Sequence, residues 1–233
     1  MRRIVELLVA SVIISLMLNL MNAIDSGDTL EAISFVLGNI SYRNITSFII
    51  TTTIWIIPQM LLFVFLGDYF ETTLIKMFSC VRTRINNSGH MILRNFLKVC
   101  GWTGLFYASM ILITIAYVFL REGTLHISLD VLIAYVACMI SYYSFILIFQ
   151  NVLSLAFGVA KSIVAVISLE TVFLYLSDTR AGLAAWIPSC WVTNLSGHNF
   201  EFVSLCCETV CLIILIVALL YLCKLMIYRK EDI

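Results

Sequence analysis

The sequence predicts an all-α fold: a single transmembrane domain of six helices with almost no soluble part. Of its 233 residues, 62% are hydrophobic and only 12% are charged, whereas soluble domains are about half apolar and about a quarter charged. The apolar residues also gather in long runs, several of which reach the roughly 20 residues a helix needs to cross a bilayer. A chain this apolar cannot cover itself with polar surface in water, so we expect the lipid bilayer to be its solvent.

Four apolar runs are long enough to span the bilayer, and a fifth region is too long for one helix. The fifth region is uncharged from Val131 to Ala160, and after Lys161 it continues to Ser177 with Glu170 as its only charge. We therefore expect two helices joined by a tight turn at 158–161. The predicted spans are 4–24, 46–66, 99–120, 129–157, 162–177 and 203–226.

The first span shares one feature with signal peptides, since Arg2 and Arg3 precede its apolar run. That run is about 20 residues long and lacks a clear small-x-small cleavage site. We therefore expect an uncleaved helix.

The lysines and arginines predict the orientation of the spans, because cytoplasmic loops carry an excess of both. Six spans put both termini on one side of the membrane, and that side holds eleven of the basic residues against three on the other. We therefore expect cytoplasmic termini. The outer three are Arg43, Arg121 and Arg180; the inner eleven are Arg2, Arg3, Lys76, Arg82, Arg84, Arg94, Lys98, Lys161, Lys224, Arg229 and Lys230.

Two segments between the spans are long enough to have a role of their own. Segment 67–98 is the longest internal one and is cytoplasmic in this topology. The external stretch from Asp178 to Phe202 contains Trp186, Pro188 and Trp191. Because tryptophan suits the headgroup region, we expect short helices in the outer leaflet there. A packed loop over the bundle is the alternative.

Several chemistries have no signature in the sequence. The net charge is zero, so no overall field indicates a nucleic-acid partner. The phosphate-binding pattern G-x-x-x-x-G-K-[ST] is missing, as are H-E-x-x-H and G-x-S-x-G. The eight cysteines contain no C-x-x-C pair, which leaves no zinc pattern. We expect no enzymatic activity, no metal and no cofactor in this chain.

Glu170 is the candidate functional residue within the spans, because it lies near the middle of span 162–177. A charge at that depth costs a few kcal/mol, about 3 on insertion scales. Two roles remain open: contact with a cationic substrate or relay of a proton, or a packing role in which the carboxyl is protonated or hydrogen-bonded to Tyr, Ser or Asn. Gln150 and Asn151 in the preceding span are candidate partners on a substrate path.

Pro58 lies inside the second span, where it removes one backbone hydrogen bond and predicts a kink. Thr51, Thr52 and Thr53 precede it and are able to bond the freed carbonyls. A kink serves either a moving gate or the shape of the packing.

The segment after the second span predicts a short amphipathic helix. Phe70, Leu74, Met77 and Phe78 recur at i, i+4, i+7 and i+8, which places them on one helical face. Asp68 and Glu71 stand at its start, where the helix dipole favours anions. This apolar face either anchors the helix at the membrane surface or docks into a partner protein.

The whole chain resembles the permease subunits of type-two ABC exporters. Those permeases have six spans, cytoplasmic termini, a coupling helix after the second span and short outer-leaflet helices before the sixth. Their coupling segment runs from an acidic residue through Thr and an apolar stretch to Arg and a further basic residue. The matching residues here are Glu71, Thr72, Leu74 to Phe78, Arg84 and Lys98, with the tail Tyr228 to Ile233 also similar; Thr72-Thr73 stands where the family often has Gly-Thr.

The resemblance implies a bacterial cell-membrane protein that works with a separate ATP-binding subunit, which would hold the ATP and Mg²⁺, and with a second permease copy, identical or paralogous. The small size is most similar to permeases for antimicrobial or cytolytic peptides, in export or in bacteriocin and lantibiotic immunity. A proton-coupled secondary transporter or a channel using Glu170 is the alternative function.

Overall fold

The computed structural model describes residues 2–21, 45–76, 88–122, 129–179, 187–188 and 202–231, and these are almost wholly helical, with no strand among them. The described helices are α1 (Arg2–Met21), α3 (Ile45–Leu66), the short π-helix η1 (Glu71–Lys76), α5 (Ser88–Glu122), α6 (Leu129–Phe157), α7 (Val159–Thr179) and α10 (Phe202–Glu231). The predicted all-α class is therefore confirmed.

Five of these helices are long and apolar enough to cross a membrane: the α3 region, α5, α6, α7 and α10. Helix α1 is also apolar, but its part with described side chains, Val5–Leu20, is shorter than the other spans. Large apolar side chains cover the outside of the bundle, and Leu120 and Val64 are 85% and 71% exposed. An outer surface of this kind indicates a bilayer as the surrounding medium.

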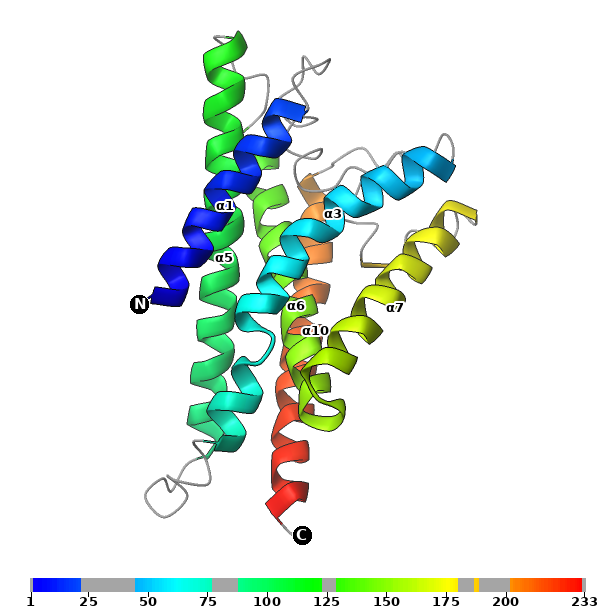
Figure 1. Cartoon of the computed structure of the whole chain (residues 1–233). Helices are drawn as coiled ribbons and strands as arrows, with labels where there is room; N and C mark the ends of the chain where they lie inside the picture. Colours follow the sequence, from blue (N-terminus) through cyan, green and yellow to red (C-terminus); the bar gives the residue numbers. More distant parts are fainter. Residues whose placement is uncertain are drawn as a thin grey trace.

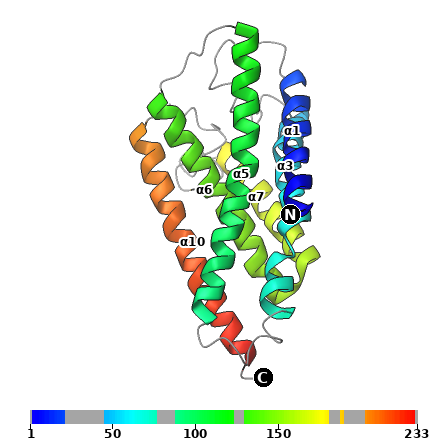
Figure 2. The ribbon, with the colours of Figure 1, turned by 90° about the vertical axis from the view of Figure 1, so that its left-hand side faces the viewer.

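Helix α6 is the centre of the bundle, because it contacts α3, η1, α5, α7 and α10. Helix α1 contacts both α5 and α3. It lies on one side of α5, and α10 lies on the opposite side (Figures 1 and 2). The C-terminal ends of α3, α6 and α10 lie at the same end of the bundle as the start of α5 and α7 (Figure 1). We call this end the Gly158 end, after the residue that joins α6 to α7.

The break between α6 and α7 lies where the sequence predicts it, but it is shorter than the predicted turn. Gly158 alone interrupts the helices, with φ at 84°, a conformation that glycine adopts without a steric penalty. Its N–H donates to the Ser154 carbonyl at 2.9 Å, and its own carbonyl accepts from the Ser162 N–H at 3.1 Å. The two helices therefore leave this residue in different directions with no intervening loop.

Helix α5 begins at Ser88, well before the predicted start of the third span at residue 99. Its 35 residues correspond to about 52 Å at 1.5 Å per residue, which exceeds a hydrocarbon core of about 30 Å. Ile92 and Phe96 lie one turn apart in the added part, and both are buried. The last third of segment 67–98 is therefore helix packed on the bundle, a correction to the predicted connecting segment.

A line of polar side chains joins α1 to α5 and was not predicted from the sequence. Ser15 Oγ donates to the Met110 carbonyl at 3.1 Å, and Asn19 Nδ2 donates to Thr114 Oγ1 at 3.1 Å. Ser11 shares a hydrogen bond with Ser109. The four-residue spacing of Ser11, Ser15 and Asn19 inside an apolar run was the available signal, since such residues join helices within a membrane.

Candidate functional site

Helix α3 carries Pro58 in its interior, and it changes direction along its length (Figure 1). The expected compensation by threonine is absent at Thr52, because its buried Oγ1 has no hydrogen-bond partner among the described residues. Trp55 and Gln59 flank the proline and are both buried. The bend in α3 is therefore the one that the proline predicts, and Trp55 and Gln59 on either side of it face the bundle interior.

The hydrogen bonding of α3 is interrupted after Leu66 by side chains from α6. In a regular helix the Phe70 N–H would bond the Leu66 carbonyl. Here the amide of Asn151 stands between them: its Oδ1 accepts from the Phe70 N–H at 3.1 Å, and its Nδ2 donates to the Leu66 carbonyl at 3.0 Å. Insertion of a side chain into the helical ladder is a recognised cause of a sharp bend.

Gln150 also donates a hydrogen bond to the backbone at this break, and it connects the break to α7. Its Nε2 donates to the Gly67 carbonyl at 3.2 Å and to Ser162 Oγ at 2.9 Å. A Cβ at Gly67 would lie 2.3 Å from the Phe63 carbonyl oxygen and 3.1 Å from Gln150 Oε1, so only glycine fits without a shift. We call Gln150, Asn151, Gly67 and Ser162 the amide clamp.

The residues after the clamp are fixed to α5 as well as to α6. The ring of Phe70 is fully buried and stacks on Phe96 with centroids 5.0 Å apart. Tyr69 packs edge-on against Trp102 at 4.9 Å and donates to Asn95 Oδ1 at 3.3 Å. This end of α3 is therefore an integral part of the bundle.

Phe70 does not contribute to an outward docking face, contrary to the prediction, because the chain's own core covers its ring. Asp68, Glu71 and Thr72 are half-buried, and Thr72 Oγ1 donates to the Asp68 carbonyl at 2.9 Å. Residues 71–76 form a π-helix, whose wider turns alter the α-helical register that the prediction assumed. Leu74 lies in this π-helix, whereas Met77, Phe78 and Arg84 lie outside the described residues.

Glu170 lies near the middle of α7 and is almost fully buried. Its Oε1 accepts a hydrogen bond from the Tyr142 hydroxyl at 2.6 Å, as the packing alternative expects. Its Oε2 has no hydrogen-bond partner within the described part of the chain. One oxygen of the carboxyl group is therefore fixed by a hydrogen bond, and the other still has its hydrogen-bonding capacity unused among the described residues.

The predicted pairing of Gln150 and Asn151 with Glu170 is wrong. Gln150 bonds Ser162, and Tyr142 bonds Glu170; the two pairs are separated by eight residues in α6 and eight in α7, which is about 12 Å in a helix. The side chains near the acid come instead from tyrosines, and nothing in the sequence pattern singled out Tyr142.

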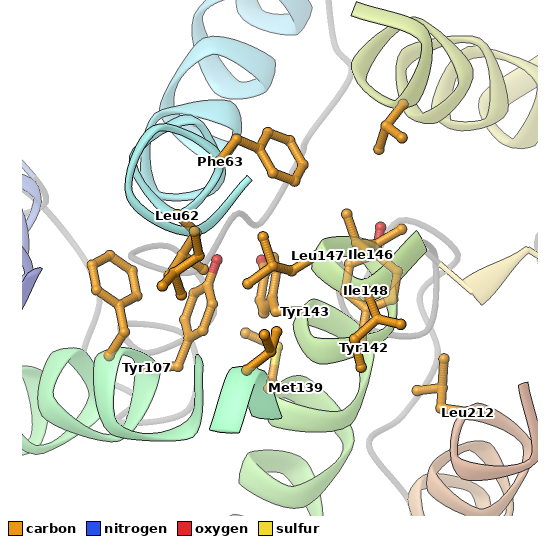
Figure 3. Close-up of a cluster of buried hydrophobic side chains, with 14 of the residues drawn as sticks. Leu62, Phe63, Tyr107, Met139, Tyr142, Tyr143, Ile146, Leu147, Ile148 and Leu212 are labelled. Carbon is orange, nitrogen blue, oxygen red and sulfur yellow. The ribbon is translucent and has the colours of Figure 1, made fainter. Parts of the chain in front are cut away.

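Several buried polar atoms that lack hydrogen-bond partners among the described residues lie around Tyr143, toward α3 and α5. Tyr143 stacks on Tyr107 with centroids 3.9 Å apart and lies near Trp55 and Gln59. Figure 3 shows Tyr143 directed toward Tyr107, whereas the adjacent Tyr142 lies on the other side of α6. Among the described residues, these atoms lack hydrogen-bond partners: Trp55 Nε1, both amide atoms of Gln59 and the Tyr107 hydroxyl.

A cavity of about 150 Å³ lies between α6 and α7 on the Tyr142 side. Its lining residues are aromatic and aliphatic apart from Glu170, with Tyr142 as the aromatic residue that carries a hydroxyl. The lining residues are Tyr142, Phe145, Ile146, Phe149, Val166, Leu169, Glu170, Phe173 and Pro188.

The comparisons with known proteins leave the family open: no family model matches the chain, and neither a curated protein nor a solved structure matches it. The class that the fold and the sites define is a helical membrane protein in which α3 is interrupted after Leu66 and α7 carries a buried acid.

Proposed function

We propose that this chain is the transmembrane permease subunit of a type-two ABC exporter in a bacterial cell membrane. A peptide or another amphiphile is the substrate, with a role in export or in immunity to such peptides. A separate subunit binds ATP with Mg²⁺ and hydrolyses it, and a second permease copy completes the transporter.

The observation that carries the proposal is the attachment of the predicted coupling segment to the bundle. The segment after α3 begins at a break that Asn151 of α6 holds open through two hydrogen bonds. Gln150 connects the same break to Ser162 of α7. A force applied to residues 68–76 by a partner is therefore delivered to α6 and α7, as an ATP-driven permease requires.

The buried position of Phe70 divides the coupling segment into two parts with different roles. Phe70 and Tyr69 anchor the segment to α5 and α6. Contact with the ATP-binding subunit falls to the later apolar residues Leu74, Met77 and Phe78. In this proposal the start of the segment is anchored to the bundle, and its later residues move with the ATP-binding subunit.

The test is co-purification of the permease with the soluble ATPase encoded by the neighbouring reading frame. A charge at Leu74 has to be buried in the partner's groove, and this costs more than burial of an unpaired neutral polar group, so Leu74→Asp lowers the co-purified ATPase at least about tenfold. Lys76→Ala, predicted to lie off the docking face, leaves most of it. Equal losses at both positions, or none at Leu74, would overturn the docking model.

A proton-coupled transporter or channel is the second candidate, because Glu170 is buried near the middle of α7 with one oxygen unpartnered among the described residues. The two candidates differ in their energy source. Flux into liposomes that is driven by a pH gradient alone, and is abolished by Glu170→Gln, would favour the second candidate. A requirement for the ATPase subunit favours the first.

The proposed topology has its own test in a variant without the native cysteines. Asn87→Cys is expected on the cytoplasmic side and Asn199→Cys outside. An impermeant maleimide added to whole cells then labels only the second. Labelling of both positions from outside contradicts the six-span arrangement with cytoplasmic termini.

A further inference from the structure

We propose that the cavity between α6 and α7 binds the ammonium end of a small hydrophobic amine, with Glu170 as its counter-ion. The proposal concerns ligand binding by this chain alone. It stands or falls separately from the proposed partnership with an ATPase.

The first argument is the asymmetry of the Glu170 carboxyl. Tyr142 donates to Oε1 at 2.6 Å and fixes its orientation, whereas Oε2 is buried without a hydrogen-bond partner in the described ranges. Ionisable residues inside membrane spans are costly and mark ligand or ion sites by default. A primary ammonium supplies both the positive charge and the N–H donor that Oε2 lacks.

The second argument is the character of the cavity walls. The rings of Phe145, Phe149 and Phe173 line the same cavity as Glu170, and those of Phe145 and Phe149 lie nearly parallel, 10° apart. Aromatic faces attract cations, and apolar walls accept the hydrocarbon part of the ligand. This lining disfavours a strongly hydrated ion, which would lose its water without replacement.

The third argument is size and access. A cavity of about 150 Å³ has room for a single aromatic ring. Leu169 and Phe173 line the cavity and are also partly exposed on the outside of α7, at 41% and 38%. A hydrophobic amine dissolved in the bilayer therefore has a path to the acid between α6 and α7.

The experiment measures binding of 4-fluorobenzylamine to the full chain in lipid nanodiscs by fluorine NMR, with empty nanodiscs as the background. The neutral 4-fluorobenzyl alcohol is the matched probe. We expect saturable binding of the amine, at least about tenfold tighter than that of the alcohol, since hydrogen bonds to charged groups are the strong ones. Glu170→Gln removes this difference and leaves the alcohol unchanged.

The matched control is Glu208→Gln, because Glu208 is also an acid within a span but lies on α10 next to Ser204 and Cys138. That variant keeps wild-type binding of the amine. If Glu170→Gln does not fold, Phe149→Leu takes its place: loss of one aromatic face weakens the amine about threefold and spares the alcohol.

Two results would overturn the proposal. Equal binding of amine and alcohol by the wild type means that the carboxyl does not recognise charge. Equal displacement of both probes by a long-chain fatty acid, with no effect of Glu170→Gln on the amine, means that the cavity holds an acyl chain.

Discussion

The amide clamp and the Glu170 site are both buried polar clusters around α6, but they differ in how completely their hydrogen bonds are satisfied. In the clamp, the side-chain amides of Gln150 and Asn151 donate hydrogen bonds to the backbone carbonyls of Gly67 and Leu66 and to the Ser162 hydroxyl. By contrast, Glu170 Oε2 and, on the Tyr143 side of α6, polar atoms of Trp55, Gln59 and Tyr107 have no hydrogen-bond partner among the described residues. A satisfied network fixes one structure, whereas an incompletely satisfied one calls for water, an ion or a ligand. The clamp is therefore a structural connection between helices, whereas the Glu170 site is where we propose that a ligand binds.

The largest expected effect is that of Asn151→Leu, which removes both bonds across the break in α3. The Leu66 carbonyl and the Phe70 N–H then remain buried without partners. At about 1–3 kcal/mol for each group, the free energy of unfolding falls by about 2–6 kcal/mol. Titration with SDS in mixed micelles measures this loss. A negligible change would mean that the two backbone groups close the break by bonding each other.

Gly67→Ala tests the steric side of the clamp. Its Cβ would lie 2.3 Å from the Phe63 carbonyl oxygen, so α3 has to shift, and we expect a loss of about 1–3 kcal/mol. Gly101→Ala is the control, since a Cβ there meets nothing within 4 Å and alanine favours the helix by about 1 kcal/mol. Opposite signs in the same unfolding assay are the expected outcome; a loss at both glycines would contradict it.

Tyr142→Phe moves the comparison to the Glu170 site. It deletes the 2.6 Å hydrogen bond to Oε1 with little change of shape. The expected loss of stability is about 1.5–3 kcal/mol for a bond to a charged group, and about 1 kcal/mol if the acid is neutral. Tyr221→Phe, at an exposed position of α10, is the control and has no measurable effect. A loss of stability as large as that of Asn151→Leu would mean that the Tyr142–Glu170 bond stabilises the bundle as much as the amide clamp does, which contradicts the comparison.

Ser15→Ala tests whether a satisfied polar contact at the edge of the bundle is as important as the clamp. Its hydroxyl bonds the Met110 carbonyl at 3.1 Å. Single side-chain hydrogen bonds between membrane helices contribute about 0.6 kcal/mol, and this is the loss we expect. Val9→Ala, on the exposed side of α1, serves as the reference. A loss of the same size there would show that the effect of Ser15→Ala does not come from its hydrogen bond.

The smallest effect is expected for Gln59→Leu. Gln59 is as buried as Asn151, but neither of its amide atoms has a partner within the described residues. Replacement by an apolar side chain of similar size therefore leaves stability unchanged or raises it. A loss like that of Asn151→Leu would show that Gln59 is hydrogen-bonded in the folded protein, and the contrast between the two clusters would fail.

The sequence alone determined the features that depend on one segment at a time. The long apolar runs predicted the membrane helices, and the predicted span 129–157 has the limits of α6. The turn at Gly158 was predicted because a break in a long apolar region needs a residue that ends a helix. The depth of Glu170 followed from its position in the run. These are local properties, and apolarity and helix length fix them before any packing takes place.

Only the tertiary structure decided which side chains meet. Gln150 and Asn151 lie more than two helical turns from Tyr142 in α6, so they bond α3 and Ser162 at a different level of the bundle from Glu170. The burial of Phe70 likewise depends on α5 beginning early enough to bring Phe96 beneath it. In a membrane both the lipid-facing and the buried faces of a helix are mainly apolar, so hydrophobicity alone does not specify the neighbour. Helix–helix packing makes that choice, and it placed the amides at the break in α3 and the acid beside the cavity.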